Sequence, residues 1–279
     1  SDWSSDVCSS DLRAAGYIIV AVLAYITSIL LPAILQSMLF FVSDGMGLSY
    51  NFLSDNPNMV YVFVALAEIV IFGTVFLLIT RRDKKDRPPL MRAEKIGIIT
   101  TAAFGISGIS LIWLIAVEKV SSMIPALQKI SESFNKNMDS INKGSYVWLI
   151  VAACVVGPVL EELIFRGVIF NLLKKTFRSP LPAILISGIA FGIWHGNLVQ
   201  SVYAIITGIV LALVYEKTND IKYPILIHVL NNALSALPSG TRNTSIPFII
   251  DIICILMIIP AFIIIRHALF RKRAAESDI

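Results

Sequence analysis

The stretch Gly157-Pro-Val-Leu-Glu-Glu-Leu-Ile-Phe-Arg166 places the ionisable side chains of Glu161, Glu162 and Arg166 inside an apolar segment, residues 147–173. A segment of this length and hydropathy is typical of a membrane-spanning helix. An ionised side chain at the centre of such a helix costs roughly 2.5–3.5 kcal/mol or more, so intramembrane acids indicate a functional site. The sequence therefore predicts a functional site inside a membrane helix.

The composition predicts an all-α fold, a polytopic membrane helix bundle. The 279 residues are 56% hydrophobic and only 15% charged, against roughly 25% charged in soluble domains. We expect about eight transmembrane helices and an intramembrane active site. The apolar runs are residues 17–42, 59–80, 96–117, 147–173, 181–198, 201–215, 223–237 and 248–265. The net charge of +4 is small and lies in the loops, which argues against a nucleic-acid partner.

The loops carry a topology signal. Lys and Arg gather in residues 81–95, 174–178 and 266–273, whereas residues 43–57 and 238–247 are poorest in them. Because basic loops stay in the cytoplasm, eight spans predict that both termini are cytoplasmic. We expect an integral multi-pass protein of a bacterial cell membrane.

The connector, residues 118–146, has apolar side chains at helical spacing. Met123, Leu127, Ile130 and Phe134 recur every three or four residues. This spacing predicts an amphipathic helix at the membrane interface.

Residues 1–12 differ from the rest of the chain, having neither a signal-peptide pattern nor an amphipathic period. We interpret them as a non-native tail translated from a sequencing adapter; the alternative is a disordered polar tail. On the first interpretation this sequence does not define the natural N-terminus. The chain then divides into N-terminal helices with the connector (13–146), a core (147–237), and a last helix with a basic tail (238–279).

Helical spacing separates the two acids. Glu162 and Arg166 are four residues apart, so they share a helix face and can neutralise each other. Glu161 points about 100° away and has no basic residue three or four positions from it. We interpret Glu162 as structural and Glu161 as available for general acid–base chemistry, although a packing network that holds both acids is the alternative.

Two of the three histidines also lie in apolar runs. His195 follows Phe191 by four residues, and His228 precedes Asn232 by four, so each pair shares a helix face. A lone intramembrane histidine is more often a satisfied core residue than a catalyst. Two of them, together with an unpaired glutamate and a buried asparagine, favour a shared site.

The ordered motifs EExxxR, FxxxH and HxxxN resemble those of the CPBP family of intramembrane proteases. That family includes type II CAAX prenyl endopeptidases and bacterial Abi-like proteins of bacteriocin processing and self-immunity. The resemblance covers about residues 147–237. It implies that Glu161 and His195 activate a water molecule, and that His228 and Asn232 form the oxyanion hole. It also implies supporting roles for Glu162, Arg166 and Phe191.

A zinc site competes with this metal-free mechanism. Glu161, His195 and His228 could form a His₂Glu set with an open position for water. The HExxH pattern of zinc proteases is absent from the sequence, and we therefore favour a glutamate mechanism with no cofactor.

The predicted function is an intramembrane endopeptidase acting on a membrane-anchored peptide or protein, lipid-modified or carrying a leader, within the bilayer. One alternative is a non-catalytic immunity or scaffold protein that binds a peptide toxin. Another is a proton-coupled transporter that uses the intramembrane acids, with Glu68 and Asp251 among them. Neither the substrate bond nor the oligomeric state follows from the sequence.

Overall fold

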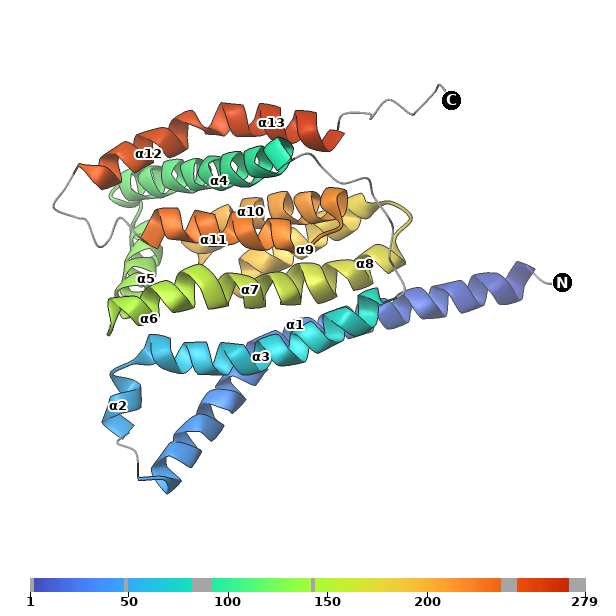
Figure 1. Cartoon of the computed structure of the whole chain (residues 1–279), viewed down its shortest axis with the longest axis horizontal. Helices are drawn as coiled ribbons and strands as arrows, with labels where there is room; N and C mark the ends of the chain where they lie inside the picture. Colours follow the sequence, from blue (N-terminus) through green and yellow to red (C-terminus); the bar gives the residue numbers. More distant parts are fainter. Residues whose placement is uncertain (1–2, 48–49, 82–91, 142–143, 237–244, 271–279) are drawn as a thin grey trace.

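The computed structural model describes residues 3–47, 50–81, 92–141, 144–236 and 245–270. All regular secondary structure in these residues is helical, which confirms the predicted all-α class. The helices lie side by side in stacked layers, with α4, α12 and α13 along one face and α1 and α3 along the other (Figure 1).

The middle of the bundle is one long span, Tyr146–Thr176, that carries the quoted stretch. It packs against α1 and α3 on one side and against α9, α10 and α11 on the other. Its consecutive parts are α6 (Tyr146–Ile150), η1 (Val151–Val156), α7 (Gly157–Glu162), η2 (Leu163–Phe170) and α8 (Asn171–Thr176). The parts η1 and η2 have π-helical bonding, a wider winding that is frequent at functional sites. The two acids therefore end a short α-helical segment between two π-helical ones.

The remaining helices surround this span, and each predicted apolar run is matched by a helix or a helix pair. Before it come α1 (Trp3–Gly45), α2 (Tyr50–Ser54), α3 (Pro57–Thr80), α4 (Arg92–Ser121) and α5 (Pro125–Ile141). After it come α9 (Pro180–Trp194), α10 (Leu198–Thr218), α11 (Lys222–Ala236), α12 (Ile246–Leu256) and α13 (Ile258–Phe270).

The number of eight spans is not confirmed. Five described helices are long and apolar enough to cross a membrane, or six if α12 and α13, bent by 45°, are one span. The helices α9 and α11 have 15 residues each, about 22 Å, against a hydrocarbon core of roughly 30 Å. Apolar runs alone do not distinguish such short helices from full spans. The chain is nevertheless an integral multi-pass membrane protein with lipid-type surfaces, since large apolar side chains on α1, α3 and α13 are exposed.

The hairpin of α9 and α10 is closed by local sequence signals. Asn197 caps α10, its Oδ1 accepting from the Val199 N–H at 2.9 Å, and Gly196 before it takes a φ of +66°. Gly208 lets the two helices approach closely, because a Cβ there would lie 2.9 Å from the Cα of Gly188. The short turn and the small residues bring α9 against α10 beside the central span.

The basic segments gather at one end of the bundle. The end of α3, the start of α4, and the ends of α8 and α13 lie at the same side of Figure 1, at its right. This arrangement is what the topology prediction requires, while the assignment of that end to the cytoplasm stays a prediction. The most basic loop, residues 82–91, lies outside the described residues.

The structure describes both the predicted amphipathic helix and most of the N-terminal tail. The amphipathic helix is α5, whose partly covered face carries Leu127, Ile130 and Phe134; Met123 lies just before it and is exposed. The N-terminal tail is not separate from the first span, because α1 is helical from Trp3 onward. The adapter origin of residues 1–12 stays a prediction.

Candidate active site

Glu162 and Arg166 form a fully buried ion pair. The Arg166 Nη1 donates to Glu162 Oε1 at 2.9 Å, and both side chains are at most 1% exposed. Arg166 also donates from Nη2 to the Gly208 carbonyl at 2.8 Å, and its guanidinium lies 4.8 Å from the centre of the Phe191 ring. The pair predicted from the spacing is present, and it ties the central span to α9 and α10.

Glu162 has a second partner that the spacing did not indicate. The Nδ1 of His228 on α11 lies 2.9 Å from the same Oε1, across 66 positions of the chain. The interpretation of Glu162 as an acid explained by Arg166 alone is therefore incomplete. The contact between Glu162 and His228 also holds the ring of His228 in place.

Glu161 faces the other side of that ring. Its Oε2 lies 3.7 Å from His228 Nε2, and the side chain is 12% exposed. Within the described residues this oxygen is buried without a hydrogen-bond partner. Such an atom needs a donor in the working protein, because an unsatisfied buried oxygen costs about 1–3 kcal/mol.

The contact with Glu162 limits what His228 can do. A carboxylate accepts, so the hydrogen of the pair belongs on Nδ1 when Glu162 is ionised. A neutral His228 then presents a lone pair at Nε2 toward Glu161. With that hydrogen on Nδ1, the ring can donate from Nε2 only when it is doubly protonated, and the predicted oxyanion role requires this form.

His195 ends α9 and is joined to the cluster through Phe191. Its Nδ1 lies 2.9 Å from the Phe191 carbonyl, so Nε2 is the nitrogen available for other partners. The Phe191 ring has its centre 4.8 Å from the ring of His195 and 5.8 Å from that of His228. Phe191 thus separates the two histidines and holds both by edge-to-face contact.

Asn232 contacts the central span where a backbone carbonyl lacks its helical hydrogen-bond donor. In η1 the Gly157 N–H bonds to the Ala152 carbonyl, so the next carbonyl, Ala153, would accept from residue 158. That residue is Pro158, which has no N–H. Asn232 supplies the missing donor, from Nδ2 to the Ala153 oxygen at 2.8 Å.

A second asparagine orients the first. Asn231 donates from Nδ2 to Asn232 Oδ1 at 3.2 Å and accepts from the Ser107 hydroxyl of α4 at 2.8 Å. The amide of Asn232 therefore keeps one N–H for Ala153 and has one further N–H. Neither Ser107 nor the carbonyl of Ala153 was identified from the sequence, since neither residue type nor spacing marks them.

The other intramembrane acids lie outside this cluster of contacts. Glu68 on α3 is 1% exposed, and its Oε1 lacks a partner among the described residues. Asp251 lies on α12, which packs against α4. No described contact joins either acid to a histidine.

The zinc set is not assembled in the described residues. Glu161 and His228 come within 3.7 Å, but no three His, Cys, Asp or Glu side chains of the described chain lie close enough together to hold a metal ion. The zinc mechanism stays a hypothesis.

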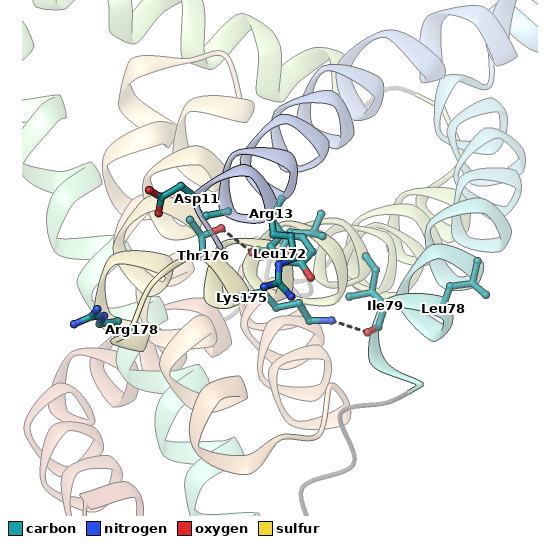
Figure 2. A pocket seen from close by; sticks show the side chains of 10 residues that line it. Asp11, Arg13, Leu78, Ile79, Leu172, Lys175, Thr176 and Arg178 are labelled. Atoms are coloured by element: carbon teal, nitrogen blue, oxygen red, sulfur yellow. Dashed lines mark hydrogen bonds between the residues drawn. The ribbon is translucent and has the colours of Figure 1, made fainter. Parts of the chain in front are cut away.

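A separate cavity of about 920 Å³ opens at the basic end of the bundle, among α1, α3 and α8 (Figure 2). Figure 2 shows Arg13, Lys175 and Arg178 around it, with Lys175 donating to the Ile79 carbonyl at 2.9 Å. None of the predicted site residues lines this cavity. The acid–histidine cluster is therefore a distinct site in the middle of the bundle.

The chain matches known proteins over the residues that form this cluster. A family model described as "Type II CAAX prenyl endopeptidase Rce1-like" matches residues 143–234, which hold the acids, both histidines and Asn232. Over these residues the chain is similar to the CPBP family of membrane proteases.

Individual relatives are bacterial. The chain is 26% identical over 221 residues to the "Membrane-embedded CAAX protease MroQ" of Staphylococcus aureus (strain USA300), covering 77% of this chain and 85% of that protein. It is 30% identical over 136 residues, 45% of this chain, to YdiL of Bacillus subtilis (strain 168), named as a candidate membrane peptidase. The chain spans 54% of YdiL, about half its length. No solved structure gave a significant match.

Proposed function

We propose that this protein is an intramembrane endopeptidase that uses Glu161 and His195 to activate a water molecule. The observation that carries the proposal is the contact of Glu161 with His228, whose ring is held from behind by the Glu162–Arg166 pair. A carboxylate beside an imidazole, inside apolar helices, can move a proton and stabilise charge where water is scarce.

The proposed reaction is hydrolysis of an amide. Glu161, aided by His195, takes a proton from water as the oxygen attacks the carbonyl carbon. Negative charge then develops on the carbonyl oxygen, where the imidazolium N–H of His228 and the second N–H of Asn232 donate. The proton passes to the leaving amine as the C–N bond breaks, which yields a carboxylic acid and an amine.

The proposed substrate is a membrane-anchored peptide or protein. The name of MroQ and the description of the matching family both refer to CAAX substrates, so a cysteine-prenylated C-terminus is the first substrate to test. The second substrate to test is a peptide that carries an apolar leader or that spans the bilayer as a single helix. The exposed apolar faces of the bundle are compatible with either, because both arrive through lipid.

The test uses purified protein in lipid vesicles with two sets of quenched fluorescent peptides. One set carries a C-terminal prenylcysteine and the other carries an apolar leader. We expect wild type to cleave at least one set and Glu161→Ala to cleave neither, at equal expression and equal thermal stability. Cleavage by Glu161→Ala at the wild-type rate would refute the mechanism. If wild type cleaves neither set but binds them, the immunity or scaffold function takes its place.

We also propose a bacterial cell membrane with both termini in the cytoplasm. The basic ends of α3, α8 and α13 lie at one end of the bundle, in accord with the positive-inside rule. Thiol labelling of single cysteines placed at residues 178 and 245 checks this: only the second should react with an impermeant reagent from outside.

A further inference from the structure

Helix α3 brings a tyrosine to the face of the central span that carries Glu161. A Cβ placed on Gly157 would lie 3.3 Å from the Tyr61 hydroxyl and 3.7 Å from Glu161 Oε1. Gly157 and Glu161 are four residues apart on α7, so they share a face. The Tyr61 hydroxyl and the Glu161 carboxylate therefore both approach the same point beside Gly157, which the Ala152 carbonyl oxygen also approaches, at 2.8 Å from that Cβ position.

The ring of Tyr61 is packed among apolar side chains, whereas its hydroxyl has acidic neighbours. Tyr61 packs with its ring against the main hydrophobic cluster, while its hydroxyl lies within electrostatic range of the Glu161 and Glu68 carboxylates. Glu68 is seven residues from Tyr61, so both side chains lie on one face of α3. That face meets η1, α7 and η2.

The Glu161 carboxylate lacks a donor at one of its oxygens. Its Oε2 is buried without a hydrogen-bond partner in the described chain, and His228 Nε2 lies 3.7 Å from it. A phenol O–H is a donor that fits a small space and carries no charge of its own.

We propose that Tyr61 is a positioning residue whose hydroxyl donates to the Glu161 carboxylate, directly or through one water molecule, across the space beside Gly157. The role rests on the proposed protease function, since it orients the carboxylate that acts as base. It makes α3 a third wall of the site, beside the central span and α11.

The experiment compares Tyr61→Phe with Tyr215→Phe. Both changes remove one phenol oxygen, and Tyr215 provides the matched control because its hydroxyl bonds to Asn171 Nδ2 at 2.9 Å, away from the acids. With the prenylated or leader peptide cleaved by wild type, we expect Tyr61→Phe to lower kcat by about 10- to 100-fold, with KM changed less than about 3-fold. Tyr215→Phe should keep kcat within about 2-fold and lower only Tm. A kcat for Tyr61→Phe within 2-fold of wild type would overturn the proposal.

A double-mutant cycle on Tm in detergent tests the same contact without any activity. Tyr61→Phe and Glu161→Ala are measured alone and together. If the hydroxyl acts on the carboxylate, adding Tyr61→Phe to Glu161→Ala should change Tm by less than about 1 °C, although alone it lowers Tm by about 2–4 °C. Additive shifts would overturn the contact. An absence of cleavage by wild type together with a non-additive cycle would refute the protease function and leave the Tyr61–Glu161 contact established.

Discussion

The Nδ1 of His228 lies 2.9 Å from Oε1 of Glu162, and this contact joins α11 to the central span at the point where the span carries both acids. It gives the Glu162–Arg166 pair a second function. The pair neutralises itself, and through Glu162 it also orients the imidazole that faces Glu161.

Arg166 should be the most costly charged residue to remove. It is fully buried, so Arg166→Met takes away the permanently cationic partner of the buried Glu162 and should reduce the free energy of unfolding by about 3–5 kcal/mol. The double variant Arg166→Met with Glu162→Gln should recover part of that loss. Thermal unfolding in detergent measures both.

The Lys174–Glu216 pair is the matched control. It joins α8 to α10, but its lysine is 31% exposed. Lys174→Met should therefore cost less than about 1 kcal/mol, because exposed pairs contribute little. An equal loss for Lys174→Met and Arg166→Met would contradict the role given to burial.

The contact between Asn232 and Ala153 separates folding from chemistry. Asn232→Leu removes the donor that the Ala153 carbonyl needs, and should cost about 1–3 kcal/mol of stability as well as activity. Adding Pro158→Ala supplies a backbone N–H at residue 158, which can then donate to the Ala153 carbonyl. The double variant should regain stability, seen as a higher Tm, but not cleavage. Recovery of cleavage would mean that Asn232 is structural only.

Gly208 should not tolerate a methyl group. A Cβ there would lie 2.9 Å from Gly188 Cα and 3.1 Å from the Phe191 ring, so Gly208→Ala should cost about 1–3 kcal/mol and reduce cleavage through displaced Phe191 and Arg166. Gly73→Ala is the control, since its Cβ would meet only one side-chain atom, at 3.9 Å. That change should be neutral or stabilising by about 1 kcal/mol. Measuring Tm and the cleavage rate of both variants tests whether close packing at Gly208 is required.

A chelator should leave the activity in place. The metal-free mechanism uses the Glu161 carboxylate and polar N–H groups, so dialysis against a zinc chelator should keep the cleavage rate within about 2-fold of the untreated rate. A loss of cleavage that added zinc restores would instead establish the Glu161, His195 and His228 set as metal ligands.

The sequence determined the class of fold and the local pairing. Hydropathy predicted a helical membrane bundle, because twenty apolar residues have few alternatives to a helix in lipid. The spacing of Glu162 and Arg166 predicted their ion pair, because four residues make one helical turn. Motif order also indicated the family whose model matches residues 143–234.

The tertiary structure decided the contacts between helices, which hydrophobic periodicity and motif spacing do not encode. The two short helices α9 and α11 leave the predicted count of eight spans unconfirmed, because hydropathy reports burial from water and not length across a bilayer. The approach of His228 to Glu162 and Glu161, and of Asn232 to the Ala153 carbonyl, depends on helices that lie far apart in sequence. Tyr61 lies one hundred residues before Glu161 (161 − 61), on a helix without a motif, so only the packing of α3 against α7 brings its hydroxyl to the face of the central span that Glu161 shares.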